Sequence, residues 1–453
     1  MASTKTPHGG SAPSVRRTAV AGSVGMFIEF YEYGIYGSFA PVIALVFFPQ
    51  AQGFVGLLLT YGIFAVTFLF RPLGGIVLGV LGDRLGRRTA LLLSLTIITV
   101  ATTLIGLLPG YAWIGVAAPI LLLLFRLAQG FSAGGEVSAA VTLVGEHAPA
   151  GKRAFYVSFV QASSFLALLI GTLLGLILTR SLSEADLQSW GWRIPFLMAL
   201  PLGLAGLWIR RKVAEPPVFQ HMREQDEIVT SPLKEAFRTR ANRRRMLMAA
   251  ALPLLNSVGY YVIFNYLPTY LTKQLKFSSG EGFAITSLGL VALIITIPFA
   301  ARLADRYGRR PLLVGSGIAM AVLAFPAYLI MQQGFALAFL GIVILALIFA
   351  GHTGVIHTVL MELFPAAVRT TSYSIGYNIG LAIFGGGGPL IVTALIASTG
   401  NPGIPAYYVI LAAVITVGCT VFLVETHEGR AAKTPTAGQD EIAIRTPTTT
   451  PSK

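Results

Sequence analysis

Charged residues are scarce in this chain of 453 residues. Only 11% are Asp, Glu, Lys or Arg, whereas a soluble globular chain carries about 25%. The deficit excludes a disordered protein, a soluble enzyme and a nucleic-acid-binding protein, because each of those classes exposes far more charge. Hydrophobic residues make up 55% of the sequence and the mean hydropathy is +0.73. We therefore expect most of the chain to lie in lipid.

Cysteine and acidic residues are also few. The one cysteine, Cys419, lies in an apolar run, which excludes a disulfide framework and a cysteine metal site. Nineteen acidic residues stand against 33 basic ones, and the excess fits basic residues that hold loops in the cytoplasm rather than a nucleic-acid partner. The sequence shows no nucleotide-binding loop, no zinc-spaced His/Cys set and no hydrolase triad. We therefore expect no enzyme activity, no metal and no cofactor.

Long stretches without formal charge mark the membrane spans. Residues 33–70 and 89–125 hold no charged side chain, and the gaps 311–361 and 370–424 are each long enough for two spans. At about 20 residues per span, the pattern predicts twelve transmembrane helices. The predicted spans are residues 18–47, 54–81, 89–108, 114–141, 154–179, 192–209, 246–271, 282–302, 311–331, 335–360, 370–397 and 404–424.

The spans define the domain organisation. The N-terminus lacks the pattern of a signal peptide. Basic residues gather in the segments that an inside N-terminus makes cytoplasmic, so we expect both termini in the cytoplasm. The predicted parts are a cytoplasmic N-terminal tail (1–17), an N-terminal six-helix bundle (18–209), a basic cytoplasmic linker (210–245), a C-terminal six-helix bundle (246–424) and a cytoplasmic C-terminal tail (425–453).

Glycines predict where helices bend or touch. The run from Gly385 to Gly388, followed by Pro389, should break or bend the eleventh span. Gly130 and Gly134 are four residues apart in the fourth span, a spacing that permits close contact between membrane helices.

A short basic motif occurs once in each half of the chain. Residues 83–88 read Asp-Arg-Leu-Gly-Arg-Arg after the second span, and residues 305–310 read Asp-Arg-Tyr-Gly-Arg-Arg after the eighth. The glycine permits a tight turn with positive φ, and the aspartate can cap a helix or pair with a neighbouring arginine. The candidate gating or structural residues are Asp83, Arg84, Arg87, Asp305, Arg306 and Arg309, together with Arg71 in the second span.

The two motifs resemble the loop between spans two and three of the major facilitator superfamily, and the likeness covers about residues 18–425. Narrower stretches, Ile28–Gly37, Gln129–Glu136 and Trp190–Phe196, resemble the metabolite:proton symporter family, which contains α-ketoglutarate, shikimate, citrate and proline/betaine carriers. Glu32 stands where that family usually has Asp.

The resemblance implies an all-α membrane protein with twelve transmembrane helices in two pseudo-symmetric six-helix bundles. It implies a multi-pass protein of the bacterial cytoplasmic membrane that uses a proton as its coupling ion. We expect membrane lipid as its surroundings and function as a monomer.

Charge inside a bilayer is expensive, so intramembrane charges mark functional candidates. Glu29 and Glu32 lie three residues apart on one helix face, and two such carboxylates in a low dielectric do not both ionise easily. They suit a reversible proton site, or a structural pair satisfied by arginines. Arg126 resembles the superfamily's span-four arginine, and its guanidinium can clamp a carboxylate. Alternatively, Arg126 is a structural partner of Glu29 or Glu32.

The remaining charges complete the candidate set. Arg71 is expected to tie the second span to Glu136 or another acid. The formal count of these buried charges leaves one net negative charge, which one proton would cancel. The proton-coupling candidates are Glu29, Glu32, Arg126 and Glu136. The substrate-binding candidates are Tyr33, Tyr36, Arg126, Gln161, Tyr260, Asn265, His352, Tyr377 and Asn378, although Tyr and Asn in membrane helices often only pack or bond across helices.

These residues predict a proton-coupled symporter that imports a small organic anion, a mono-, di- or tricarboxylate, by alternating access. The fifth span lacks the Gly-Pro pattern associated with antiporters of the superfamily, which favours symport. An alternative is proton-coupled import of a zwitterionic osmolyte such as proline or betaine, held by aromatic faces. A second alternative is a non-transporting membrane sensor, although no signalling domain is evident.

Overall fold

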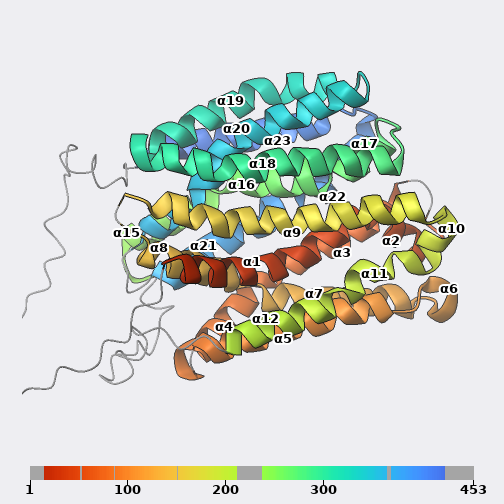
Figure 1. Cartoon of the computed structure of the whole chain (residues 1–453), viewed down its shortest axis with the longest axis horizontal. Helices are drawn as coiled ribbons and strands as arrows, with labels where there is room; N and C mark the ends of the chain where they lie inside the picture. The colour runs from red at the N-terminus through yellow and green to blue at the C-terminus, as the bar shows by residue number, and fades with distance from the viewer. Residues whose placement is uncertain are drawn as a thin grey trace, which may run out of the picture.

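The computed structural model describes residues 15–51, 54–85, 87–149, 151–211, 237–364 and 369–423, and every regular element within them is helical. The helices run side by side along the long axis of the molecule (Figure 1). The predicted C-terminal tail and most of the predicted N-terminal tail and linker lie outside the described residues. Residues 15–17 and 240–245, which were predicted to belong to the tail and the linker, are helical.

The first half of the chain forms six spans, several of them built from more than one helical segment. Its elements are α1 (Val15–Ser38), α2 (Ala40–Phe47), α3 (Val55–Leu69), α4 (Arg71–Leu85), α5 (Arg87–Leu107), α6 (Tyr111–Ile114), α7 (Ala117–Ser132), α8 (Glu136–His147), α9 (Arg153–Ser181), α10 (Glu184–Asp186), the π-helical turn η1 (Leu187–Gly191), α11 (Arg193–Leu197) and α12 (Ala199–Arg211).

The second half repeats the arrangement. Its elements are α15 (Arg240–Ala251), α16 (Leu254–Val258), the π-helical turn η2 (Gly259–Asn265), α17 (Leu267–Lys273), α18 (Ser279–Tyr307), α19 (Arg309–Met331), α20 (Phe335–Glu362), α21 (Arg369–Gly380), the π-helical turn η4 (Leu381–Gly385), α22 (Gly388–Thr399) and α23 (Ile404–Val421).

The predicted helical spans are confirmed, although two of them begin earlier than predicted. In the described residues, ten helical stretches are long and apolar enough to cross a bilayer, and α1 with α2 makes an eleventh that bends by 66°. The twelfth is α5, whose apolar part, Leu92–Leu107, is shorter. Pro41 lies in the first turn of α2, and because proline lacks a backbone N–H it helps to set the bend.

Two spans begin earlier than predicted. The sixth begins at Glu184 because the Ser183 hydroxyl accepts a hydrogen bond from the Asp186 amide at 3.1 Å and caps α10. The seventh begins at Arg240, where Thr239 accepts from the Asn242 amide at 3.1 Å. The last residues of the predicted linker are therefore helical.

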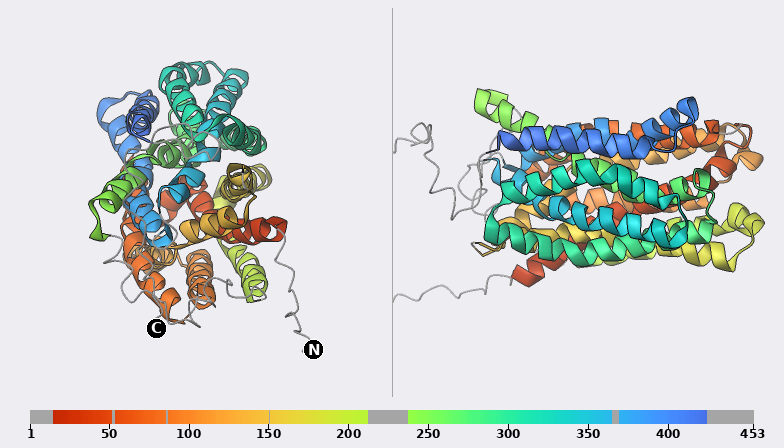
Figure 2. Two further views of the ribbon diagram at one scale, coloured as in Figure 1. Left: turned by 90° about the vertical axis from the view of Figure 1, so that its left-hand side faces the viewer. Right: turned by 90° about the horizontal axis from the view of Figure 1, so that it is seen from above.

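The two halves lie against each other along several helix pairs. The end-on view separates the helices of the first half from most of those of the second (Figure 2, left). Contacts between the halves join α9 to α18 and α20, α3 to α22, and α21 to α4 and α8. We call the end of the bundle where α12 ends and α15 begins the linker end; α2, α6, α10 and α17 lie at the opposite end (Figure 1).

The glycine predictions are confirmed at the positions that matter most for packing. A Cβ on Gly134 would collide with the backbone of Arg71 and Gly75, and one on Gly130 with the backbone of Thr67. The α7 segment therefore touches the second span backbone to backbone. The eleventh span breaks between Gly385 and Gly388. In the motif of the second half, Gly308 has a φ of +105°, which favours glycine.

Candidate functional site

Arg71, the first residue of α4, is completely buried and contacts both halves. Its Nη2 donates to Glu29 Oε1 at 2.8 Å and to the Ala133 carbonyl at 3.1 Å, while Nη1 donates to the Tyr33 hydroxyl at 3.0 Å. Its Nε donates to Oδ1 of Asn378, on α21 of the second half, at 3.1 Å. Glu29, rather than Glu136, is therefore the acid that Arg71 binds, and the contact with Asn378 suits a gating role.

Arg126, on α7, is also completely buried and lies within an aromatic enclosure. Its Nη1 donates to Glu32 Oε2, and to Gln129 Oε1 at 2.8 Å. The guanidinium carbon lies 4.2 Å from the centroid of the Tyr36 ring and 5.3 Å from that of Phe64. These distances are typical of cation–π contacts. Of the two carboxylates considered as its partner, the structure pairs Arg126 with Glu32.

In both acid–base pairs, some buried polar atoms form no hydrogen bond within the described residues. Among the described residues, no group forms a hydrogen bond with Glu29 Oε2, with Glu32 Oε1, or with Nε and Nη2 of Arg126. All of these atoms are buried. Buried donors and acceptors of this kind are costly unless a further partner binds to them. Each pair therefore retains hydrogen-bonding atoms that its partners do not use.

Aromatic rings from both halves surround the pairs. We call Tyr33, Phe64, Phe68, Tyr260 and Tyr261 the aromatic cluster. The Tyr261 centroid lies 5.1 Å from that of Phe68, 5.7 Å from that of Phe64 and 6.4 Å from that of Tyr33. Tyr260 and Tyr261 belong to the π-helical turn η2 of the second half, and such turns are frequent at functional sites.

Two asparagines of the second half donate hydrogen bonds to the first half beside this cluster. Asn378 Nδ2 donates to the Gly134 carbonyl at 2.6 Å, and Ser374 Oγ donates to the same carbonyl at 2.8 Å. Asn265 Nδ2 donates to the carbonyl of Tyr33 at 2.9 Å. Both predicted asparagines therefore lie at the interface between the halves, next to the charged pairs.

Four other residues were predicted to bind substrate: Tyr36, Tyr377, Gln161 and His352. The Tyr36 hydroxyl donates to the Thr60 carbonyl at 3.0 Å, within the first half. Tyr377 is buried in the second half, its centroid 5.5 Å from that of His357. Gln161 and His352 are buried as well. None of the hydrogen bonds that Arg71 and Arg126 form within the described residues involves these last two side chains.

The motif residues of the second half join the two halves at the linker end. Asp305 accepts hydrogen bonds from the amides of Ala154 at 3.1 Å and Phe155 at 2.8 Å, in the first turn of α9. A carboxylate at a helix N-terminus is favourable. Arg309 lies 3.3 Å from both Asp305 and Glu362. Asp305 therefore caps a helix of the other half, rather than the next helix in the chain.

Four predicted gating residues remain: Arg306, Asp83, Arg84 and Arg87. Arg306 is exposed, with its guanidinium 5.3 Å from the Tyr307 centroid. The side chains of Asp83, Arg84 and Arg87 lie outside the described residues.

Contacts between the halves also close the opposite end. The Tyr61 hydroxyl lies 3.0 Å from Oγ1 of Thr269, which joins α3 to α17. Ser287 Oγ donates to Thr172 Oγ1 at 3.1 Å, which joins α18 to α9. Because the halves touch at both ends, the charged pairs are enclosed on either side.

Glu136 has a partner that the sequence did not suggest. The guanidinium of Arg210, near the end of α12, forms an ion pair with its carboxylate. Arg210 belongs to the predicted linker and so was left out of the count of buried charge. With it included, three carboxylates face three guanidiniums, and the net negative charge inferred from the sequence disappears.

Phe64, Phe68 and Tyr261 were also missed. An apolar aromatic residue in a membrane helix carries no distinctive signal, because most such residues face lipid or pack. The one available hint was that Tyr261 adjoins Tyr260, and that Phe64 and Phe68 lie four residues apart and close before Arg71.

Two six-helix halves that enclose buried acid–base pairs, with contacts between the halves at both ends, define a multi-pass membrane transporter that works by relative movement of its halves. The family model of the Major Facilitator Superfamily matches residues 22–375 and 254–450. The chain belongs to the major facilitator superfamily, which confirms the resemblance inferred from the repeated motif.

Curated relatives cover nearly the whole chain. The glycine betaine/proline/ectoine/pipecolic acid transporter OusA of Dickeya dadantii (strain 3937) is 36% identical over 420 residues, which are 91% of this chain and 84% of that protein. The proline/betaine transporter of Escherichia coli (strain K12) is 35% identical and covers the same shares, 91% and 84%. The citrate-proton symporter of Klebsiella pneumoniae is 32% identical, over 91% of this chain and 95% of that protein.

Solved structures agree on the fold. The xylose transporter XylE from E. coli, in a partially occluded inward open conformation, superposes with a TM-score of 0.74 at 19% sequence identity. The match covers 92% of this chain and 99% of that chain. At this identity the likeness supports the twelve-helix architecture alone.

Proposed function

We propose that the chain is a proton-coupled symporter that imports a zwitterionic osmolyte, such as proline or betaine, by alternating access. The observation that carries this proposal is the setting of Arg126. Its Nε and Nη2 have no hydrogen-bond partner among the described residues, and its guanidinium lies 4.2 Å from the Tyr36 ring. A fork of donors for a carboxylate thus lies beside ring faces that can hold a cation.

The charge balance of the site supports a neutral cargo. Glu29 is paired with Arg71, and Glu32 with Arg126, so the centre carries no net charge. A zwitterion leaves that balance unchanged, whereas a di- or tricarboxylate would bring several uncompensated negative charges into a low dielectric. A zwitterion therefore adds no charge of its own, whereas a di- or tricarboxylate would stay negative after one coupling proton had bound.

The relatives also favour the osmolyte. The relatives include the glycine betaine/proline/ectoine/pipecolic acid transporter of D. dadantii, at 36% identity, and the proline/betaine transporter of E. coli, at 35%. The citrate-proton symporter of K. pneumoniae is slightly less similar. The small organic anion inferred from the sequence is therefore less well supported than the zwitterionic alternative, and we keep it as the second candidate.

The interface between the halves suits alternating access. Asn378 closes the linker end, and the pair Tyr61–Thr269 closes the opposite end. Opening one end breaks these hydrogen bonds, together with those of Asp305 at the linker end or that of Ser287 at the opposite end. We propose that the substrate reaches Arg126 from the opposite end and leaves through the linker end.

The remaining parts of the proposal concern placement. We propose that the linker end faces the cytoplasm, with both termini on that side, in the bacterial inner membrane. The predicted bundles 18–209 and 246–424 are the two moving bodies, and one chain suffices for transport. The charge that supports this orientation includes Arg243, Arg244 and Arg245 in the first turns of α15, at the linker end.

Uptake by proteoliposomes tests the function. Purified protein is reconstituted, an inward proton gradient is imposed, and accumulation of labelled proline, glycine betaine and citrate is followed with and without an uncoupler. We expect proline or glycine betaine to accumulate and the uncoupler to abolish the accumulation. Accumulation of citrate with neither zwitterion would reject the osmolyte and select the second candidate.

A variant links the result to the site. Phe64→Leu removes one ring face beside Arg126, and because a desolvated cation–π contact is worth about 1–2 kcal/mol, affinity for glycine betaine should fall roughly five- to thirtyfold. Leu59→Ala, at an exposed position on the same helix, is the control. An unchanged affinity in Phe64→Leu would remove the aromatic argument.

A further inference from the structure

Two small cavities lie inside the first half, away from the interface between the halves. Each has a volume of about 10 Å³, close to the space that one water molecule needs. Both lie between α1, α5 and α12, and Ile98 of α5 lines both. They therefore follow one another along a single helix groove.

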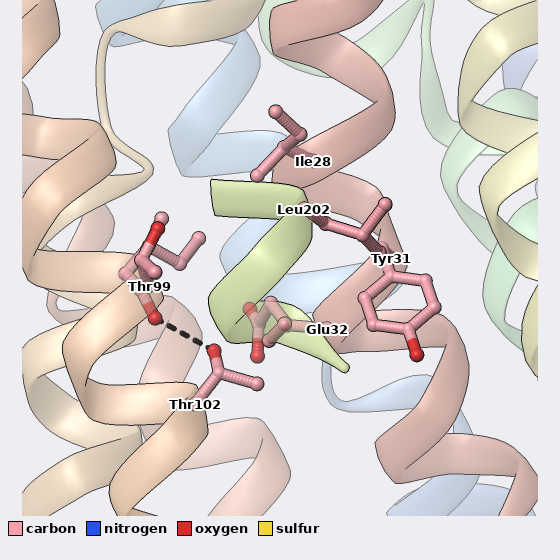
Figure 3. Close-up of a pocket in the computed structure, with 8 residues that line it drawn as sticks. Ile28, Tyr31, Glu32, Thr99, Thr102 and Leu202 are labelled. Atoms are coloured by element: carbon pink, nitrogen blue, oxygen red, sulfur yellow. Dashed lines mark hydrogen bonds between the residues drawn. The ribbon is translucent and has the colours of Figure 1, made fainter. Parts of the chain in front are cut away.

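Acidic side chains line each cavity. The first, which we call the inner cavity, is bordered by Glu32, Tyr31, Thr99 and Thr102. Figure 3 shows the Glu32 carboxylate beside Thr102. The second, the outer cavity, is nearer the linker end and is bordered by Glu29, Glu136, Ser94 and Arg210.

The carboxylates present unpartnered oxygens there. Glu32 Oε1 and Glu29 Oε2 are buried and form no hydrogen bond within the described part of the chain, although their other oxygens bind Arg126 and Arg71. A buried carboxylate oxygen beside a water-sized polar space is a site for an ordered water. Each cavity thus offers a water molecule one strong acceptor.

Hydrogen bonds connect the inner cavity to Arg126. Gln129 accepts from Arg126 Nη1 at 2.8 Å and donates through Nε2 to the Thr102 hydroxyl at 2.7 Å. Thr102 in turn donates to the Ile98 carbonyl at 2.7 Å. The state of the Glu32–Arg126 pair is therefore linked to the cavity wall, and not only to the interface between the halves.

Between the cavities the groove is apolar. Ile28, Leu95 and Ile98 form a small packed cluster of their own. Ser94, Ile98 and Thr102 lie four residues apart on one face of α5, so about 6 Å of helix axis separates each from the next. Ile98 therefore lies between Thr102, which lines the inner cavity, and Ser94, which lines the outer cavity.

We propose that protons cross the first half by a route of their own, from Glu32 through the inner cavity, past Ile98, to Glu29 and Glu136 at the outer cavity. The neutral Glu32 carboxyl gives its proton to water in the inner cavity. That water passes a proton past Ile98 to water in the outer cavity, which protonates the Glu29 carboxylate, so each O–H bond that breaks is matched by one that forms. The charged or titratable groups facing the route are Arg126, Arg71, Tyr31, Tyr33 and Arg210.

The inference rests on the proposed proton coupling and adds a second pathway to it. The substrate moves between the halves, at Arg126 and the aromatic cluster. The proton leaves between α1, α5 and α12. The two can then be separated by substitutions that do not touch the substrate.

Filling the groove tests the route. Ile98→Phe places a larger apolar side chain between the cavities, whereas Val100→Phe makes the same change at an exposed position of α5. Proteoliposomes carrying a pH-sensitive dye report proton entry driven by proline, and labelled proline reports both counterflow and gradient-driven accumulation. Ile98→Ala, which enlarges the connection, is the opposite variant.

We expect Ile98→Phe to keep proline counterflow within about twofold of the wild type while gradient-driven accumulation and proton entry fall about tenfold, a barrier increase of about 1.4 kcal/mol. Ile98→Ala and Val100→Phe should keep both activities. Equal retention of both activities in Ile98→Phe would overturn the route. Equal loss of both would also overturn it, because the substitution would then be blocking the movement of the halves.

The response of the wild type to the proton gradient distinguishes a failure of this inference from a failure of the proposed function. If the wild type showed no accumulation driven by the proton gradient, the symport proposal would fail, and the route would fail with it. If the wild type responds and Ile98→Phe responds equally, the symport stands and the route is rejected.

Discussion

Asn378 is the position where one substitution should change the balance between open and closed states most clearly. Its Oδ1 accepts from Arg71 Nε at 3.1 Å, and its Nδ2 donates to the Gly134 carbonyl at 2.6 Å. Both bonds cross between the halves at the linker end. A hydrogen bond to a charged group contributes about 1.5–3 kcal/mol and a neutral one about 0.5–1.5 kcal/mol.

Asn378→Ala removes both bonds, so the closed linker end should lose roughly 2–4 kcal/mol relative to the open one. At 1.4 kcal/mol per factor of ten, the ratio of closed to open molecules should fall about 30-fold or more. Arg71 keeps its bonds to Glu29 and Tyr33, so the buried charge stays paired and the protein should fold.

Spin-label distances measure the shift. In a Cys419→Ser background, labels at Arg16→Cys and Arg306→Cys sit on exposed positions in different halves at the linker end. Double electron–electron resonance should show the longer distance gaining population in Asn378→Ala but not in Ile379→Ala, an exposed neighbour on the same helix. Identical distance distributions in wild type and Asn378→Ala would refute the gating role.

Further substitutions separate proton, substrate and structural roles. Glu29→Gln and Glu32→Gln should differ: the variant at the coupling carboxylate keeps counterflow but loses gradient-driven uptake, and identical profiles would contradict the assignment. Arg126→Lys keeps the charge but loses the fork of donors, so proline affinity measured by calorimetry should fall about tenfold or more; an unchanged Kd would exclude Arg126 from binding. Asp305→Asn weakens the cap on α9 and should cost about 1 kcal/mol of stability, seen as a lower melting temperature. Glu146→Gln breaks the partly exposed ion pair with Arg369 and should lower the free energy of unfolding by less than about 1 kcal/mol. A larger loss of stability would contradict the small contribution expected from an exposed pair.

The helical architecture could be predicted from sequence because charge marks the boundaries of membrane spans directly. The predicted ends at residues 331 and 335 coincide with the end of α19 and the start of α20. Errors arose where polar residues belong to a helix beyond the lipid. Arg240 begins α15 in this way, and a hydropathy pattern places no boundary there.

The pairing of buried charges was only partly predictable. Glu32 was one of two acids considered for Arg126, and helix periodicity could not choose between it and Glu29. Arg71 was predicted to bind Glu136 or another acid, and Arg210, which pairs with Glu136 in the structure, was placed in the linker. The choice depends on how α1, α4, α7 and α12 pack, and a single sequence does not contain that information.

The limit of prediction from sequence is clearest for the aromatic cluster. Tyr33 and Tyr260 were noticed because a tyrosine hydroxyl is unusual in lipid. Phe64 and Phe68 carry no polar atom, so their role beside the charged pairs emerges only when η2 brings Tyr261 against them.

Because the two central ion pairs, Glu29–Arg71 and Glu32–Arg126, lie wholly within the first half, they bear on how the membrane potential acts. Glu29–Arg71 and Glu32–Arg126 move as one body, so these pairs carry no net charge through the electric field when the empty protein resets. A zwitterion adds none, and on the proposed function the proton is the single charge that crosses. Each 100 mV then contributes about 2.3 kcal/mol, enough for a roughly 50-fold concentration ratio. A cell with equal pH on both sides could still fill with osmolyte, driven by voltage alone.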